Sequence, residues 1–250
     1  MTAIRAVIFD LGHTVWDFAP TANARRLNVL RLQQRLEDAL DLEVPPPGVL
    51  DDALLASSKR WFREWYDDPA RLEQPPSSGI ITQAIAPLGL HPAPDVLDDL
   101  TRIIYGTEVD MPVIEPDTLA AIATLDARGL TMGCVTNTIL LPEGITDAID
   151  RLGLRRYFRS VVVSSEMGYR KPHSSLFLRA AEELAVAPEE ALFVGDRVVD
   201  DVGGAQAVGM RGVLTHQYRQ EPLDGAAVTP DAVIQRLAEL PSLALLRNGG

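Results

Sequence analysis

The chain has 250 residues, of which 46% are hydrophobic and 23% are charged, a composition typical of globular proteins. Its formal net charge of −12 disfavours a nucleic-acid partner, because an acidic surface repels a phosphate backbone. No apolar run approaches the ~18 residues of a membrane span, and the first residues lack the apolar segment of a signal peptide. We therefore expect a cytoplasmic protein without a membrane partner. The single cysteine, Cys134, excludes an internal disulfide and a cysteine-based metal cage.

A short apolar run near the N-terminus leads directly into a carboxylate. Residues 4–10 are predicted to form a strand that is buried on both faces, and Asp10 is its last residue. A charge is costly inside a core, but it is tolerated at the carboxyl end of a strand, where open α/β sheets bind ligands. Asp10 is therefore the first candidate for chemistry, and the alternative is a turn or helix-capping aspartate.

The next stretch, residues 17–111, is predicted to be entirely helical. Leucines recur at helical spacing between residues 27 and 40, and the prolines at 45–47 end that first helix. The predicted helices of this stretch cover residues 21–40, 49–66, 80–88 and 94–105. No segment within it resembles a buried strand, so we expect a helical insertion that lies over the sheet as a lid.

From residue 115 onward, predicted strands alternate with predicted helices. The strands cover residues 130–135, 160–163, 191–194, 212–214 and 232–234. The helices cover residues 116–128, 142–152, 174–184, 201–209 and 235–246. Such alternation predicts right-handed βαβ units and a doubly wound parallel sheet with helices on both faces. The predicted fold is thus an α/β core, residues 1–16 and 112–250, that carries the all-helical insertion.

Polar side chains follow the predicted strands at one edge of this sheet. Asp10 ends the first strand, Thr136 and Asn137 follow the second, and Asp196 follows the fourth. Lys171 lies in the loop after the third strand. The carboxyl ends of parallel strands share an edge, so we expect these groups to meet in one crevice.

These residue types suit phosphoryl transfer through an aspartyl intermediate. A carboxylate such as Asp10 can act as the nucleophile and form an acyl phosphate. Because a carboxylate and a phosphate repel each other, a cation is needed, and Mg²⁺ bound to Asp10 and Asp196 would serve. The Lys171 ammonium, the Thr136 hydroxyl and the Asn137 backbone N–H would hold the phosphate oxygens.

The chain resembles the haloacid dehalogenase-like hydrolase superfamily at four motifs that occur in order. The segments that carry the resemblance are Phe9-Asp10-Leu11-Gly12-His13-Thr14, Val135-Thr136-Asn137, Gly168-Tyr169-Arg170-Lys171-Pro172, and Gly195-Asp196 through Asp200-Asp201. The helical insertion between the first two motifs resembles the helical cap domain of that superfamily.

The resemblance implies a role for each matching position. Asp10 would be the nucleophile and a metal ligand, the Gly12 carbonyl a second ligand, and Asp196 a third. Asp201 would complete the metal site by supporting its waters or Lys171, and Asp200 competes for that role. The phosphate-binding set would be Gly12, His13, Thr136, Asn137 and Lys171, with Asp10, Thr136 and Lys171 as the catalytic residues.

The sequence departs from the superfamily pattern at Gly12. Phosphatases of the superfamily usually carry a second aspartate there as general acid and base, a function worth about 10²–10⁴-fold in rate. Three interpretations follow. In the first, the protein is a phosphatase in which His13, a residue of the insertion or water transfers the proton. In the second, it mainly binds a phosphorylated ligand. In the third, it cleaves a halide–carbon bond, or a phosphonate bond through a Schiff base on Lys59.

The first interpretation, a Mg²⁺-dependent phosphatase of a small phosphorylated metabolite, is the favoured one. We expect the specificity of such an enzyme to reside in the inner face of the helical insertion. We expect a monomer or a homodimer.

Overall fold

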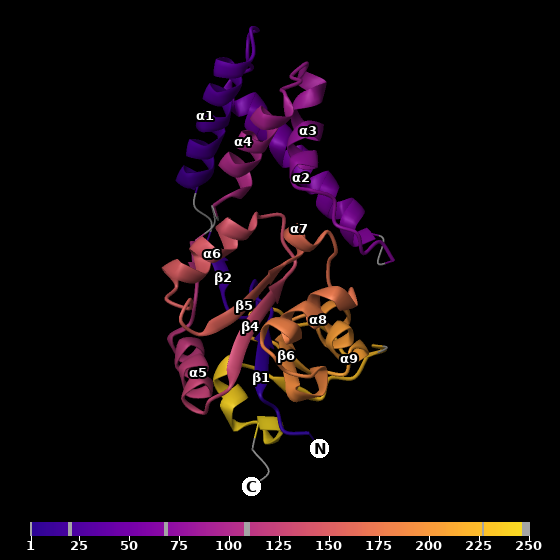
Figure 1. Ribbon diagram of the computed structural model, residues 1–250. Helices are drawn as coiled ribbons and strands as arrows, with labels where there is room; N and C mark the ends of the chain where they lie inside the picture. The colour runs from indigo at the N-terminus through magenta and orange to yellow at the C-terminus, as the bar shows by residue number, and fades with distance from the viewer. Residues whose placement is uncertain (1, 20–21, 68–69, 108–110, 227, 247–250) are drawn as a thin grey trace.

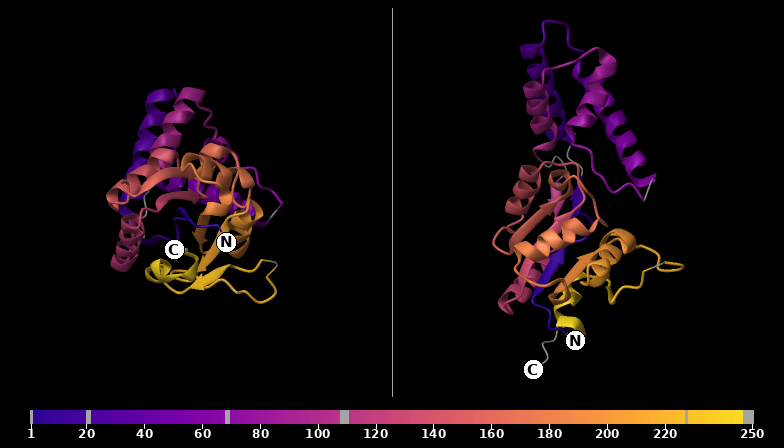
Figure 2. Two further views of the ribbon diagram at one scale, coloured as in Figure 1. Left: turned by 60° about the horizontal axis from the view of Figure 1, so that its bottom comes forward. Right: turned by 45° about the vertical axis from the view of Figure 1, so that its right-hand side comes forward.

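The structure is a computed structural model that describes residues 2–19, 22–67, 70–107, 111–226 and 228–246. It has two parts, a sheet flanked by helices and a group of helices beyond one end of that sheet (Figure 1). The N- and C-termini lie together at the opposite end (Figures 1 and 2).

The described residues form a six-stranded sheet in which every neighbouring pair of strands is parallel, in the order β5-β4-β1-β6-β7-β8. The strands are β1 (Ala6–Phe9), β4 (Thr131–Thr136), β5 (Phe158–Val163), β6 (Ala191–Gly195), β7 (Arg211–Thr215) and β8 (Ala232–Ile234). In the centre, Ala6 of β1 is in register with Thr131 on one side and with Ala191 on the other. This arrangement confirms the predicted parallel α/β sheet.

Successive residues of β1 belong to two different cores. Val7 and Phe9 pack into a core that includes Ile122 of α5 (Pro116–Ala127) and Ile149 of α6 (Pro142–Arg151). Ile8 packs into a core with Phe177 of α8 (Ser174–Glu183). Because side chains alternate along a strand, an entirely apolar strand requires cover on both faces. The apolar run at the N-terminus therefore specifies a central strand between two helical layers.

Helices α1 (Ala22–Ala39), α2 (Pro47–Asp67), α3 (Ser78–Ile85) and α4 (Pro94–Tyr105) form the group beyond the sheet, which we call the helical block. Helix α1 packs against α4, and α2 packs against α3. Their buried side chains include Leu32, Leu36, Leu50, Ile81 and Leu100. The prediction placed α2 later, at residue 49, because a proline run was expected to exclude helix. Pro47 begins α2 instead, where proline costs no hydrogen bond.

A short antiparallel pair of strands, which the sequence did not predict, joins the helical block to the core. Strand β2 (Asp17–Ala19) pairs with β3 (Met111–Val113), with Asp17 opposite Val113. Three residues are too few to show an alternating pattern, and Pro112 disfavours a strand assignment. The pair returns the chain to the core beside the point at which it left, so the insertion has closely spaced ends.

Two predicted helices near the C-terminus differ from the structure. The helix predicted over residues 235–246 is wrong, because the chain there forms two short 3₁₀ helices, η4 (Leu237–Ser242) and η5 (Ala244–Leu246), with Pro241 inside the first. The helix predicted over residues 201–209 is a π-helical turn, η3 (Val198–Gly203), followed by α9 (Gly204–Ala207). Pro241 explains why residues 235–246 do not form an α-helix, because proline removes a helical hydrogen bond.

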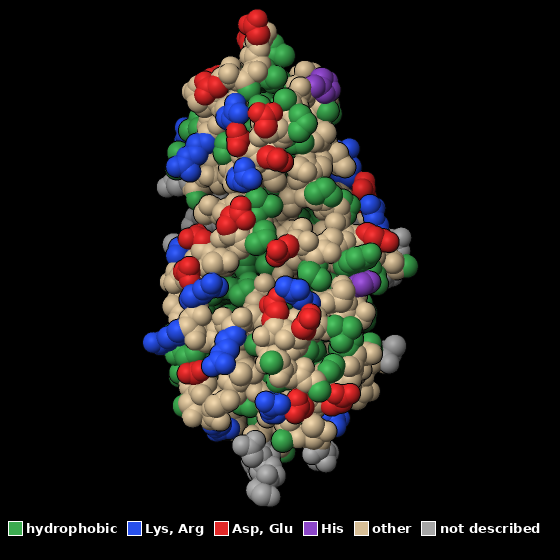
Figure 3. All heavy atoms as spheres, viewed as in Figure 1, with side chains coloured by type: hydrophobic (Ala, Val, Ile, Leu, Met, Phe, Trp, Pro, Cys, Tyr) green, Lys and Arg blue, Asp and Glu red, His purple; other side chains and the backbone are tan. Residues whose placement is uncertain are grey.

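Several short helices complete the described structure. They include helix α7 (Ser164–Met167) and 3₁₀ helix η2 (Pro188–Glu190), while η1 (Ala86–Leu88) extends α3 in the helical block. Within the described residues, no helix combines the length and apolarity that a membrane crossing requires. Acidic and basic side chains are interspersed on the face of the molecule that Figure 3 shows.

The helical block rests on the carboxyl edge of the sheet through the segment that joins α2 to α3. Gln74 Nε2 donates a hydrogen bond to the Thr138 carbonyl at 2.6 Å, and Ser77 Oγ donates to the Ile139 carbonyl at 2.6 Å. The Arg170 backbone N–H donates to the Leu72 carbonyl at 2.8 Å. These contacts hold the block directly above the loops that follow β4 and β5.

Candidate active site

All eight residues proposed from the sequence line one cavity of about 260 Å³ at the carboxyl edge of the sheet. We call this the catalytic cavity. Its lining includes Asp10, Gly12, His13, Thr136, Asn137, Lys171, Asp196 and Asp201. The strand ends that carry these residues are far apart in the sequence. The topology of the sheet therefore produces the convergence that the motif positions predicted.

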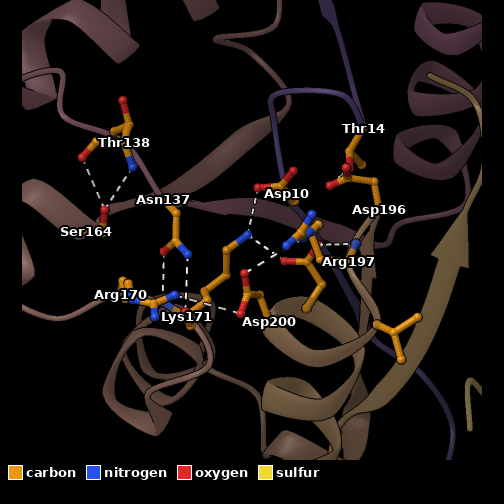
Figure 4. Close-up of polar contacts among 12 residues, drawn as sticks. Asp10, Thr14, Asn137, Thr138, Ser164, Arg170, Lys171, Asp196, Arg197 and Asp200 are labelled. Carbon is orange, nitrogen blue, oxygen red and sulfur yellow. Dashed lines mark hydrogen bonds and ion pairs between the residues drawn. The ribbon is translucent and has the colours of Figure 1, made fainter. Parts of the chain in front are cut away.

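The Lys171 ammonium is the centre of this site. Its Nζ atom points toward Asp10 and lies 2.6 Å from Asp10 Oδ1 (Figure 4). The same atom lies 2.7 Å from Asp201 Oδ1, and the side chain is 2% exposed. Burial alone would lower the pKa of Lys171, but the Asp10 and Asp201 carboxylates outweigh that effect and raise the pKa above its ordinary value. Lys171 is therefore a permanent cation that presents its charge beside Asp10.

Asn137 fixes the backbone from which Lys171 projects. Its Oδ1 atom accepts a hydrogen bond from the Lys171 backbone N–H at 2.8 Å, and its Nδ2 atom donates to the Lys171 carbonyl at 3.2 Å (Figure 4). The side chain of Asn137 is thus committed to the loop after β5. Thr136, the last residue of β4, is buried and lines the catalytic cavity.

Asp201 is oriented through both of its carboxylate oxygens. Its Oδ1 atom accepts a hydrogen bond from Lys171 Nζ, and its Oδ2 atom accepts one from the Arg197 backbone N–H at 2.9 Å. Space for this carboxylate exists because residue 195 is glycine: a Cβ on Gly195 would lie 2.3 Å from the Asp201 carboxyl carbon. Asp200, its neighbour, lies instead 4.0 Å from Arg170 Nη1 and 3.9 Å from Arg197 Nε. Of the two aspartates left open by the sequence, Asp201 is the one that contacts Lys171.

Three carboxylates meet in the cavity, and their charge exceeds that of the adjacent lysine. Asp10, Asp196 and Asp201 each place one oxygen within 4.8 Å of the others. Burial, followed by the neighbouring Asp10 and Asp201 carboxylates, raises the pKa of Asp196 to about 8. Burial also raises the pKa of Asp10, although Lys171 opposes this effect. Such a site favours an additional cation, which would relieve the repulsion among the carboxylates.

The acidic cluster fits a hard divalent cation. Its donors are carboxylate oxygens, which are the ligands that Mg²⁺ and similar ions prefer. Asp196 Oδ2 is buried and receives no hydrogen bond, although Arg219 Nη1 lies 3.0 Å away as an ion pair. The arrangement therefore could hold a metal ion.

His13 occupies an unusual backbone position. Its φ is 60°, in the left-handed region that a non-glycine residue adopts at a cost. Its Nδ1 atom lies 2.9 Å from Asp17 Oδ1, and its ring meets the edge of Phe18 with a centroid separation of 5.6 Å. The imidazole thus lines the catalytic cavity and contacts Asp17 and Phe18 of β2.

The structure adds two residues that the sequence did not assign. Thr14 is fully buried, and its Oγ1 atom lies 3.5 Å from Asp196 Oδ1, so it bridges the first and fourth motifs (Figure 4). The sequence signal that could have identified Thr14 is its position in the first motif, four residues after Asp10. Arg219 reaches Asp196 from the loop after β7, and no motif marks it in the sequence.

A protein-family model described as haloacid dehalogenase-like hydrolase matches residues 4–209. The chain therefore belongs to the haloacid dehalogenase-like hydrolase family.

Similar proteins agree with this membership over nearly the whole chain. The sequence is 28% identical over 240 residues to the glyceraldehyde 3-phosphate phosphatase of Methanopyrus kandleri, with 95% of each chain covered. It is 29% identical over 252 residues to the phosphoglycolate phosphatase of Shigella boydii, covering 97% of this chain and 93% of the relative. The crystal structure of a 2-haloacid dehalogenase from Pseudomonas syringae is similar with a TM-score of 0.61 and 25% identity, covering 96% of this chain and 97% of that one.

Proposed function

We propose that this protein is a phosphatase that hydrolyses a small phosphorylated metabolite through an aspartyl-phosphate intermediate on Asp10. The observation that supports this most is the position of the Lys171 ammonium, 2.6 Å from Asp10 Oδ1 and inside the same cavity as Thr136 and Asp196. The relatives named as phosphatases over 95% or more of this chain support the same reaction.

In the proposed reaction, an oxygen of the Asp10 carboxylate attacks the phosphorus of the substrate. The bond from phosphorus to the alcohol oxygen breaks, and that oxygen leaves with a proton. Water then attacks the acyl phosphate, which releases inorganic phosphate and restores Asp10. Lys171 and Thr136 hold the phosphate oxygens, and the Asn137 side chain keeps the Lys171 backbone in place.

We propose Mg²⁺ as the cation, held by Asp10, Asp196 and the Gly12 carbonyl. When bound, it supplies positive charge that neutralises the substrate phosphate beside the carboxylates. Asp201 takes the supporting role, because both of its oxygens already accept hydrogen bonds from Lys171 and Arg197. Thr14 and Arg219 orient Asp196.

The proton for the leaving alcohol must come from a group other than residue 12. His13 lines the catalytic cavity, and its contact with Asp17 fixes the ring, so it is the side chain best placed for this task. Lys59, the Schiff-base candidate of the phosphonate-cleaving alternative, does not line the catalytic cavity but a neighbouring one. The structure thus offers that alternative no support.

We also propose the division into an α/β core, residues 1–16 and 112–250, and a helical cap, residues 17–111. The strands β2 and β3, which join the helical block to the core, support the boundary. The cytoplasm, proposed as its location, is consistent with one cysteine and hence no internal disulfide. A monomer or homodimer remains the expected assembly.

The test is hydrolysis of an aryl phosphate by the purified protein with Mg²⁺, alongside the Asp10→Asn variant. We expect turnover in the wild type and its loss by at least about 10³-fold in Asp10→Asn, because an amide cannot form the acyl phosphate. Asp224→Asn, which alters an exposed carboxylate that neither lines the catalytic cavity nor belongs to the acidic cluster, is the matched control. Equal activity in Asp10→Asn would refute the nucleophile. Magnesium-dependent phosphate binding with no turnover in the wild type would instead identify a binding protein.

A further inference from the structure

A second cavity, of about 410 Å³, adjoins the catalytic cavity. We call it the upper cavity, because its lining residues come from helices α1, α2 and α4 of the helical block, from β2 and from the loop at residues 138–140. Phe18, Phe62 and Thr138 line both cavities. A molecule whose phosphate lies beside Asp10 can therefore extend its other end past these residues into the upper cavity.

Most of the upper cavity is apolar. Its aliphatic lining is Val29, Leu54, Leu55, Ile104, Ile139 and Leu140. The cavity falls within the ~300–1,000 Å³ range of pockets that bind drug-sized organic molecules. An apolar cavity of this size beside a charged site is suited to a ligand with an ionic head and an apolar body.

The polar groups of the upper cavity are largely paired with one another. Arg25 Nε lies 2.6 Å from Asp51 Oδ1, so the charges of this pair compensate each other. Ser58 Oγ and Tyr105 OH lie 3.3 Å apart and form a hydrogen bond. Lys59 is exposed to solvent. The interior thus offers hydroxyl groups but no uncompensated buried charge, which disfavours a second anionic group on the ligand.

We propose that the upper cavity binds the alcohol portion of the substrate, and that the preferred substrates are phosphate monoesters of a bulky, largely apolar alcohol. The inference rests on the proposed function, since it places the phosphate at Asp10. It differs from the substrates in the names of the relatives, glyceraldehyde 3-phosphate and phosphoglycolate, whose organic parts are short and polar. Such short molecules would leave the upper cavity without an apolar ligand.

The first experiment compares kcat/KM for ethyl phosphate, hexyl phosphate and phosphoglycolate. Each methylene that leaves water for an apolar cavity favours binding by about fourfold at most. We expect hexyl phosphate to exceed both short substrates by about tenfold or more. Because an inactive wild type would leave this ratio undefined, the dissociation constants of ethyl and hexyl phosphate are also measured by calorimetry on Asp10→Asn.

A cavity-filling variant tests the location. In Leu55→Trp the larger side chain occupies part of the upper cavity, so the preference for hexyl over ethyl phosphate should fall by about tenfold. Leu27→Trp is the matched control, because Leu27 lies on α1, is 47% exposed and does not line the cavity. It should leave both rates unchanged. If Leu55→Trp fails to fold, Ile104→Phe fills the cavity from α4 instead, and the preference for hexyl over ethyl phosphate should fall in the same way.

The outcomes separate this inference from the proposed function. Hydrolysis of phosphoglycolate or ethyl phosphate as efficient as that of hexyl phosphate would overturn the inference and leave the phosphatase intact. A wild type without turnover would remove the phosphatase, while tighter binding of hexyl than of ethyl phosphate, abolished by Leu55→Trp, would still support the upper cavity as the ligand site. A chain-length preference that Leu55→Trp and Ile104→Phe both leave unchanged would also overturn it.

Discussion

The ring of Phe18 lies over Gly12, and its Cε2 atom is 3.1 Å from the position that a Cβ on residue 12 would take. This is closer than ordinary van der Waals contact, so any side chain at residue 12 requires the ring to move. The departure of residue 12 from the superfamily pattern is thus coupled to an aromatic residue in the connection to the helical block. An aspartate at residue 12 would therefore fit best where Phe18 is also replaced by a smaller side chain.

The paired change gives the first prediction. Gly12→Asp with Phe18→Leu should raise turnover of alkyl phosphates, whose poor leaving groups need a general acid, more than that of aryl phosphates. Gly12→Asp alone should gain less, because Phe18 obstructs the new carboxylate. Steady-state kinetics on both substrate types, with Phe18→Leu as the control, measure the effect. A uniform loss in the double variant would contradict this account of Gly12.

A second prediction distinguishes the two adjacent aspartates of the fourth motif. Asp201→Asn should lower activity by about 10²-fold or more, because its carboxylate receives the Lys171 ammonium at 2.7 Å. Asp200→Asn should cost less than about tenfold, since its ion pairs with Arg170 and Arg197 are 4.0 Å and 3.9 Å long and Asp200 is not part of the acidic cluster. Rates for the two variants at saturating substrate provide the comparison. A larger loss in Asp200→Asn would reverse the assignment.

A third prediction concerns the acidic cluster in the absence of substrate. Mg²⁺ should raise the unfolding temperature of the wild type, because a ligand that binds only the folded state stabilises it. The rise should be smaller or absent in Asp196→Asn, which removes one charged ligand. Asp224→Asn, a change at an exposed loop position, should keep the full rise. An unfolding temperature that does not respond to Mg²⁺ in the wild type would contradict the metal site.

A fourth prediction tests an acid-sensitive contact outside the site. Partial burial alone would raise the pKa of the Asp231 carboxyl, but hydrogen bonds from Gln206, the Gly212 backbone and Arg211 outweigh it and lower the pKa. A lowered folded-state pKa means that this contribution is complete above the unfolded-state pKa and is lost as the pH falls through the folded-state value.

Asp231→Asn should therefore reduce the free energy of unfolding by about 1 kcal/mol at pH 7. The difference from the wild type should shrink below about pH 4, where the carboxyl becomes protonated first in the unfolded state and, at lower pH, in the folded state. Denaturant titrations at several pH values measure it, with Asp224→Asn as a neutral control. A difference that stays constant down to pH 2 would show that Asp231 stabilises the protein through packing rather than charge.

Prediction from sequence succeeded where short-range patterns specify the structure. The apolar run that ends at Asp10 predicted a strand buried on both faces, and residues 7 and 8 do pack into different cores. It failed over residues 235–246, where an apolar pattern suggested an α-helix but 3₁₀ turns around Pro241 formed. It also missed β2 and β3, because three-residue strands have no periodicity to detect.

By itself the sequence determined which chemical groups this protein carries to the edge of its sheet, since each of Asp10, Thr136, Lys171 and Asp196 lies at the end of a strand that its own neighbours specify or in the segment after it. Only the tertiary structure decided that Asp201 rather than Asp200 contacts Lys171, and that Arg219 reaches Asp196. The tertiary structure also decided that an apolar cavity lies beside the catalytic cavity. The reason is that the succession of strands and helices along the chain, and their hydrophobic periodicity, are encoded locally, whereas contacts between loops depend on how distant segments pack.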